Sequence, residues 1–274
     1  MTDLPMRAHL VTGGFPPGRS AGHDHDYARI RILEMFEETE IHCSVTNDFV
    51  DVERWLPISR LMITYVAGPV LQDGQAAFVE EWMAKGGRWL GLHGTSGGKA
   101  QRLEGQRQRA MVKMRHHEAL GGFFINHPPV RRFTVDVADA NHPLTRGLPS
   151  SFEVVDEPYM IEVLDLKRSK VLLTAELGPD ASPPGFGFIY ESDTALLPDG
   201  KTRVIAYTHD VGEGAVAYIA LGHSHSPSTN SQPFVDASVD PEGKTPPYLR
   251  TTWETEGFGK LLHNAINWGM RADE

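Results

Sequence analysis

The chain lacks the features of disulfide-stabilised and membrane-spanning proteins. Cys43 is the only cysteine among 274 residues, so no disulfide can form within the chain, and a reducing compartment is expected. No apolar run approaches the length of a membrane span, and the segment Met1 to Arg7 has no apolar core of a secretory signal. These absences predict a cytoplasmic globular protein without membrane contact.

Positive charge is scarce as well. The sequence has 26 lysines and arginines against 36 aspartates and glutamates, a formal net charge of -10 at pH 7. Nucleic-acid backbones and anionic lipid surfaces repel such a protein, so neither is expected as a partner. A dinucleotide fingerprint is also missing, because Gly13-Gly14 lacks both the third glycine and the acid about twenty residues further on. No nicotinamide cofactor is therefore predicted.

Strand-like and helix-like segments alternate in the first half of the chain. Apolar runs predict strands at 8–12, 40–46, 60–66 and 88–92, and apolar residues at helical spacing predict helices that begin at Asp24 or Asp26 and at Gln72. This alternation is typical of an α/β fold, a three-layer arrangement in which helices cover both faces of a mostly parallel sheet. No linker or repeat interrupts the sequence, so residues 1–274 are expected to form a single domain.

The second half is less regular. Strands are predicted at 130–137 and 171–175, and the turn signal from Asp210 to Gly214 predicts a β-hairpin between 204–208 and 215–221. The basic stretch 101–117, which ends in His116-His117, is expected to be a solvated helix. A last helix is predicted within 249–270, and its apolar stripe consists of Phe258, Leu261, Leu262, Ile266 and Trp268.

The most informative local pattern is Gly91-Leu92-His93-Gly94. A buried strand that runs into a turn of small residues presents one side chain at the carboxyl edge of an α/β sheet. Many α/β enzymes place their nucleophile at such a corner, but here the side chain is the imidazole of His93. His223 also follows a predicted strand directly. The two imidazoles are expected to meet at one crevice, where they suit acid–base or metal chemistry.

An ordered set of motifs resembles the trehalose-utilisation, or ThuA-like, family, whose fold is similar to class I glutamine amidotransferases and to flavodoxin. No single motif is specific, but the set follows the order of the family and covers almost the whole chain. It comprises Gly91-Leu92-His93, Leu120-Gly121-Gly122-Phe123, His127-Pro128, the run from His142 to Pro149, Phe152-Glu153-Val154, Asp156-Glu157-Pro158-Tyr159, Gly214 to Tyr218, and Leu221-Gly222-His223-Ser224.

The chain departs from the amidotransferase pattern at the residues that hydrolyse glutamine. Those enzymes carry a cysteine at the corner, and a glutamate two residues after their histidine. Here the corner residue is His93, and His225 occupies the position after His223 where the acid is expected. Cys43 lies on a different predicted strand. Because a glutaminase needs an activated thiolate, glutamine hydrolysis is excluded.

The candidate site combines His93, His223 and Glu157 as catalytic residues with five residues expected to contact substrate. His127 and Glu157 enter through the resemblance and their turn context, and the substrate contacts are His23, Asp24, His127, His225 and Tyr159. Three imidazoles, those of His93, His127 and His223, could hold a divalent ion, zinc or manganese. Alternatively, the imidazoles act as acid and base without metal, so no cofactor is required.

Structural roles remain open for several of these residues. A tight turn alone can explain His93, and a solvated strand end can explain Asp156-Glu157. His225 can equally face solvent, and Asp24 can cap a helix without touching a ligand. His142 is expected to brace the turn before Pro149.

The resemblance implies action on trehalose or a related disaccharide, after oxidation to a 3-keto form by a partner dehydrogenase. Proton transfer beside the ketone would give isomerisation, or cleavage of the glycosidic bond. The alternatives are a metal-dependent hydrolase, and a sugar-binding or assembly module without catalysis. Aromatic rings that could stack on sugar are Trp55, Tyr159, Phe186 and Trp253. At least one of the long loops 179–198 and 228–247 is expected to border the site, and a homo-oligomer is a further expectation.

Overall fold

A computed structural model describes residues 6–37 and 39–270. The strands are β1 Arg7–Gly14, β2 His42–Thr46, β3 Leu61–Ala67, β4 Arg88–Leu92, β5 Lys99–Arg102, β6 Arg109–Val112, β7 Gly122–Asn126, β8 Arg131–Val137, β9 Ser151–Asp156, β10 Met160–Val163, β11 Ser169–Glu176, β12 Thr202–Val211 and β13 Gly214–Ile219. The helices are α1 His25–Glu34, α2 Val52–Trp55, α3 Asp73–Ala84, α4 His116–Leu120 and α5 Glu256–Met270, with short 3-10 turns η1 Leu56–Ile58, η2 His93–Ser96 and η3 Thr252–Glu254. None of these helices is long and apolar enough to cross a bilayer.

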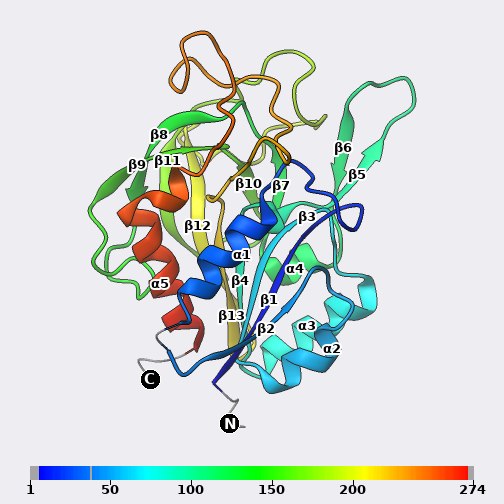
Figure 1. Ribbon diagram of the computed structural model, residues 1–274, viewed down its shortest axis with the longest axis vertical. Coiled ribbons are helices and arrows are strands. Elements are labelled where there is room, and N and C mark those ends of the chain that lie inside the picture. Colours follow the sequence, from blue (N-terminus) through cyan, green and yellow to red (C-terminus); the bar gives the residue numbers. More distant parts are fainter. Residues whose placement is uncertain (1–5, 38, 271–274) are drawn as a thin grey trace.

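A large mixed sheet organises the molecule, with few helices around it (Figure 1). Its strand order is β2-β1-β3-β4-β13-β12-β11-β8-β9. The pairs from β2 to β13 are parallel, and the pairs from β13 to β9 are antiparallel. The expectation of a mostly parallel sheet is therefore wrong for this half. Short connections such as that between Val211 and Gly214, which lie opposite each other, can join only antiparallel strands.

Two hydrophobic clusters lie against the sheet, because successive side chains of a strand point to opposite faces. In β1, Leu10 belongs to one cluster and Val11 to the other. Helices α1 and α5 contribute to the first cluster, and α3 contributes to the second. The apolar stripe predicted for the last helix is confirmed, since Phe258, Leu261, Leu262 and Ile266 are buried and Trp268 packs partly against the same cluster. Each such buried side chain contributes roughly 1.5–3 kcal/mol.

The helix predicted over 101–117 is wrong. This stretch forms the antiparallel β5–β6 hairpin, followed by the short helix α4. Gly105 adopts φ +73° at the tip, and most side chains of both strands are exposed, so a charged surface fits a hairpin as well as a helix. His116 and His117 were expected on the surface, but both are buried where α4 meets the body of the protein.

Candidate functional site

His93 lies at a sharp corner directly after β4. Its backbone is left-handed, with φ 46°, a conformation that costs a residue with a side chain about 1–3 kcal/mol and that the surrounding contacts must hold. The next residue is Gly94, where a Cβ would lie 2.4 Å from the carbonyl oxygen of Val66. The His93 side chain is fully buried. The corner predicted from the sequence is confirmed.

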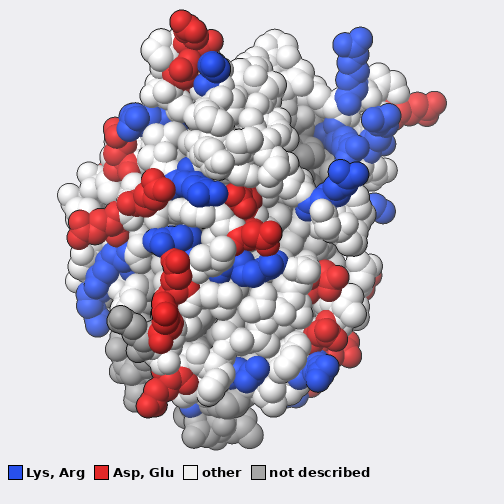
Figure 2. Space-filling model, viewed as in Figure 1, with Lys and Arg blue, Asp and Glu red and all other residues white. Residues whose placement is uncertain are grey.

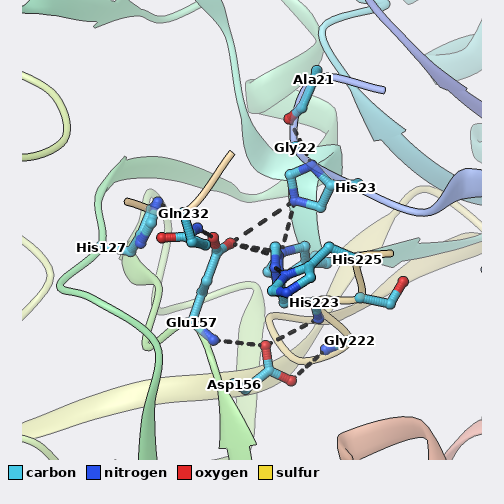
Figure 3. Close-up of polar contacts among 12 residues, drawn as sticks. Ala21, Gly22, His23, His127, Asp156, Glu157, Gly222, His223, His225 and Gln232 are labelled. Atoms are coloured by element: carbon cyan, nitrogen blue, oxygen red, sulfur yellow. Dashed lines mark hydrogen bonds and ion pairs between the residues drawn. The ribbon is translucent and has the colours of Figure 1, made fainter. Parts of the chain in front are cut away.

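Three imidazole rings converge on one carboxylate. Glu157 Oε2 lies 3.0 Å from His93 Nε2, 3.2 Å from His223 Nδ1 and 3.9 Å from His23 Nε2. One ligand atom from each of the four residues lies within 4.8 Å of the others, and all four are buried. We call these four residues, His23, His93, Glu157 and His223, the histidine centre. Figure 3 shows the rings of His23 and His223 turned toward Glu157.

Backbone carbonyl groups fix the tautomers of two of these rings. His93 Nδ1–H donates to Ala220 O at 2.8 Å, and His23 Nδ1–H donates to Ala21 O at 2.9 Å, because a carbonyl oxygen can only accept. In the neutral rings, both Nε2 atoms therefore carry lone pairs. These two atoms lie 3.1 Å apart, and both face the carboxylate of Glu157.

His225 fixes the third ring by the same logic. Its Nε2–H donates to Pro246 O at 2.9 Å, which leaves Nδ1 as an acceptor for His223 Nε2–H at 3.0 Å. The lone pair of His223 Nδ1 then faces Glu157. Three lone pairs and a carboxylate thus point into one small space, and only a cation, a proton or a metal ion, can satisfy them together.

The pKa values in the centre follow from the balance between burial and charge. Burial alone would raise the pKa of Glu157, but the charges of His127 and His223 and hydrogen bonds from the rings hold it well below its usual value. Burial alone would lower the pKa of His93, but its hydrogen bond and attraction to Glu157 raise it. The pKa of His23 falls well below its usual value through burial and through repulsion by His223 and His93. His93, next to an ionised Glu157, therefore holds a proton more readily than His23 does.

Asp156 supports the centre from below and was missed as a site residue. Its carboxylate accepts hydrogen bonds from the backbone N–H groups of Glu157 at 2.8 Å, Gly222 at 2.8 Å and His223 at 3.0 Å (Figure 3). It thereby ties the end of β9 to the segment after β13. A solvated strand end is excluded, since Asp156 and Glu157 are both buried. The available signal was only its position next to Glu157.

Other expected site residues lie around the centre. His127 lies on the opposite side of the carboxylate, with Nε2 3.7 Å from Glu157 Oε1, so His23 rather than His127 joins the group of four (Figure 3). Tyr159 stacks on the ring of His93 at 4.1 Å. Asp24 caps α1 through the N–H of Tyr27 and forms an ion pair with Arg250. The cap predicted for this helix is confirmed.

The centre opens into a cleft of about 640 Å³. His127, Glu157 and Tyr159 line it, together with Phe188 of loop 179–198 and Gln232 of loop 228–247. The Gln232 amide donates a hydrogen bond to Glu157 Oε1. The expectation that a long loop borders the site is thus confirmed.

Three further expectations concern residues outside the cleft wall. His142 braces its turn, since its Nδ1 accepts from Leu144 N–H at 3.2 Å. Neither Trp55 nor Trp253 lines the cleft. The ring of Trp55 stacks on His9, and the indole N–H of Trp253 donates to Gly222 O at 2.8 Å. Phe186 contacts the ring of His127 instead.

Comparison with known proteins agrees with this architecture. Residues 18–237 match the ThuA family, described as trehalose utilisation. Solved structures of similar fold include ThuA-like proteins from Bacteroides uniformis (TM-score 0.62, 18% identity, 98% of this chain and 93% of that chain covered) and Parabacteroides merdae (TM-score 0.56, 16% identity, 98% and 91% covered). A cytoplasmic protein from Salmonella typhimurium aligns with TM-score 0.53 and 9% identity over 96% and 98% of the two chains. No curated protein matches the chain.

Proposed function

This chain belongs to the ThuA family, and from that premise we propose that it is a carbohydrate-metabolism enzyme that moves a proton beside a carbonyl group of a saccharide. The observation that carries the proposal is the convergence of three imidazole lone pairs on the carboxylate of Glu157. The substrate class is a disaccharide or its 3-keto derivative, supplied by a partner dehydrogenase in the cytoplasm. Abstraction of the proton next to the ketone leads to isomerisation or to elimination of the glycosidic bond.

The histidine centre is proposed to hold a divalent metal ion. A tetrahedral zinc site with bonds of about 2.0–2.1 Å places its ligand atoms about 3.4 Å apart. Four of the six separations within the centre, 3.0, 3.1, 3.2 and 3.9 Å, bracket this value, and all six lie within 4.8 Å. Imidazoles that donate their second N–H to a carbonyl or to another side chain are typical of metal ligands. Three nitrogens and one oxygen favour zinc, with manganese as the alternative.

With a metal held by these four residues, the ion could polarise the substrate carbonyl as a Lewis acid only by accepting the carbonyl oxygen as an additional ligand. His127 would then be the base, because this ring is not among the four residues that would hold the ion. Its Nδ1–H donates to Pro128 O at 2.8 Å, so Nε2 carries the lone pair, and this ring lines the cleft. Without a metal, His93 is the leading base, His223 is its partner and Glu157 orients them. Because its pKa is raised, the His93 ring would in this form also serve as the acid that returns the proton.

Two adjoining clefts provide room for a disaccharide. A second cleft of about 650 Å³ lies at the carboxyl ends of β1, β2 and β3, and Phe15 and His23 line both clefts. The Phe15 side chain belongs to a residue that is 61% exposed, so its apolar ring can pack against the C–H face of a sugar. One ring of the substrate would lie at the histidine centre and the other beyond Phe15.

Glutamine hydrolysis has no support in the chain. Cys43 lies on β2 and its Sγ–H donates to Ser44 O at 3.5 Å. Burial raises the pKa of this thiol to about 12, so it stays protonated at neutral pH. Neither a thiolate nor a cysteine at the corner is therefore available for acyl transfer.

Metal analysis of protein purified without a polyhistidine tag tests the proposal. We expect close to one equivalent of zinc or manganese, lost in His93→Ala and kept in the matched control His263→Ala, an exposed histidine of α5. Turnover of 3-keto and unmodified disaccharides, followed by mass spectrometry, should fall in His93→Ala in either form. If the protein is purified without metal and its turnover resists a chelator, the proposal that the centre holds a metal ion is refuted. If turnover is unchanged in His93→Ala, the proposal that the histidine centre takes part in catalysis is refuted.

A further inference from the structure

Part of the wall of the cleft carries positive charge. Lys99 of β5 and Arg109 of β6 both line the cleft at whose inner end Glu157 lies. Figure 2 shows lysine and arginine side chains gathered over the β5–β6 hairpin, although the chain as a whole has a net charge of -10. This local excess of cations contrasts with the rest of the surface.

The cations of the hairpin stand opposite each other. Arg102 and Arg109 are direct cross-strand partners, so their side chains share one face of the hairpin with Ala100 and Met111. Arg109, Ala100 and Met111 line the cleft, which identifies this face as the inner one. Like charges directly opposite in an antiparallel pair are destabilising, and the cost is removed when an anion lies between them.

Among the described residues, no acid pairs with Arg102 or Arg109. Within residues 6–37 and 39–270, no ion pair involves Lys99, Arg102 or Arg109. Other cations nearby do find acids, because Lys113 pairs with Glu162 at 2.7 Å and Arg115 pairs with Glu80 at 3.6 Å. The inner face of the hairpin thus carries the guanidinium groups of Arg102 and Arg109 without an acid partner among the described residues, whereas Lys99 belongs to the other face.

The backbone at Arg109 is fixed to the body of the protein. Arg109 O accepts a hydrogen bond from Ile189 N–H at 2.9 Å, and the Gln108 amide donates to Phe186 O at 3.0 Å. These contacts attach β6 to loop 179–198, which also borders the cleft. The guanidinium group therefore projects from an anchored strand rather than from a free loop.

We propose that the substrate is a carbohydrate with an anionic group, a phosphate or a carboxylate, and that Arg109 and Arg102 bind this group. The inference rests on the proposed function, because it assigns the substrate class of the same cleft. Guanidinium groups bind both anions through paired N–H donors. The anionic group would lie toward the hairpin, where the guanidinium groups are, and the reacting carbonyl would lie at the histidine centre.

Calorimetric titration of the full chain with three probes tests the inference. The probes are trehalose 6-phosphate, maltobionate, which carries a carboxylate, and neutral trehalose. We expect at least one anionic probe to bind about tenfold more tightly than trehalose, as charged hydrogen bonds allow. The preference should shrink between 0.05 and 0.5 M salt, since exposed charges are screened. Comparison of the two anionic probes distinguishes phosphate from carboxylate.

Matched variants of the hairpin complete the test. Arg109→Ala should remove the tenfold preference and Arg109→Lys should keep part of it, whereas Arg107→Ala, at the exposed tip outside the cleft, should change binding less than twofold. Equal affinity for all three probes, or an equal loss in Arg107→Ala, would overturn the inference. Because Arg109 is exposed, thermal melting should show that its variants stay folded.

Failure of this inference is distinguishable from failure of the proposed function. If Arg109→Ala keeps its metal and its turnover, and a neutral sugar is the better substrate, only the inference that the substrate carries an anionic group is contradicted. If the protein binds anions through Arg109 but holds no metal and turns over no saccharide, only the proposed enzymatic function is contradicted.

Discussion

Two groups of buried histidines in this protein differ in a single kind of neighbour. The histidine centre contains Glu157, whereas the pair His116 and His117 on α4 contacts backbone carbonyl groups, the other ring and Phe123, and no acid is among these contacts. Burial, followed by repulsion from His117, lowers the pKa of His116 to about 3, and burial lowers that of His117 as well. The pKa of His93, although equally buried, is raised. Burial favours the neutral form of a histidine, and the hydrogen bond to a buried acid outweighs burial at His93, whereas at His23, which lies 3.9 Å from the same acid, burial and the neighbouring rings prevail.

The hydrogen bonds show the same contrast. His117 Nε2–H donates to Ser96 O at 3.1 Å, and its Nδ1 accepts from Met114 N–H at 2.8 Å, so the neutral ring satisfies both of its nitrogens. In the centre, the outer nitrogens of His23 and His93 are bonded, but the inner ones face each other and a carboxylate. The ring of His117 is thus tied to the fold through both nitrogens, whereas the inner nitrogens of the centre face a space that a proton or a metal ion could occupy.

Removal of the acid should have the largest effect, because it makes the centre resemble the pair on α4. In Glu157→Gln, the pKa of His93 should fall below its ordinary value and turnover should fall by roughly a thousandfold, within the range for a lost acid–base group. Zinc should no longer stabilise this variant. In the wild type, zinc at a hundred times its dissociation constant should raise the free energy of unfolding by about 2.7 kcal/mol. Thermal melting with and without zinc, together with a turnover assay, measures both effects.

The control is Glu153→Gln on the same strand, where an exposed glutamate pairs with Arg132. This variant should keep turnover and the response to zinc, since surface ion pairs contribute at most about 1 kcal/mol. If Glu157→Gln retains zinc binding and full turnover, the acid does not distinguish the two histidine groups.

The pair on α4 should instead make stability depend on pH. The folded pKa of His116, about 3, lies below the unfolded value of 6.5, so the unfolded chain takes up the proton first as pH falls. The stability from neutral His116 is complete above pH 6.5 and is lost as pH falls toward 3. Between pH 8 and pH 5 the loss is about 2 kcal/mol. The free energy of unfolding of His116→Phe should therefore fall by about 2 kcal/mol less than that of the wild type between pH 8 and pH 5.

Urea unfolding in the presence of a chelator measures this difference without a contribution from metal. His263→Phe is the control, because His263 is exposed and its substitution should leave the pH dependence unchanged. Equal pH slopes for His116→Phe and the wild type would mean that His116 is not held neutral by burial.

Local patterns were sufficient to predict the elements that form the corner. Strands β1, β3 and β4 and the helices α3 and α5 were expected from short-range periodicity, and His93 from the small residues around it. The ordered motifs brought in Glu157 and His223. These residues could be recognised because each directly follows a strand or lies in a family motif.

Long-range contacts account for what the sequence did not predict. The role of Asp156 depends on backbone groups 66 and 67 residues away, and the burial of His117 depends on carbonyls of Ser96 and Gly97. His23 enters the centre from a loop between β1 and α1, whereas the sequence predicted His23 as a substrate contact and did not include it among the metal ligands. The hairpin at 99–112 was missed because exposed charges do not reveal a period.

The smallest expected effect concerns His225, which belongs to neither group but sets the tautomer of His223. Without an acceptor at His225 Nδ1, the ring of His223 is free to place a proton on the nitrogen that faces Glu157. His225→Phe should therefore weaken zinc binding about tenfold, the lower end for the loss of a group that orients a metal ligand. Competition with a zinc indicator measures this change.

His225→Gln should restore affinity, because an amide can accept from His223 Nε2–H and donate to Pro246 O as the imidazole does. Loss of affinity in both variants would instead indicate that His225 acts by packing. If His225→Phe binds zinc as tightly as the wild type, the tautomer of His223 does not depend on its hydrogen bond to His225. The centre would then differ from the pair on α4 only by its acid, and the contrast would rest on Glu157 alone.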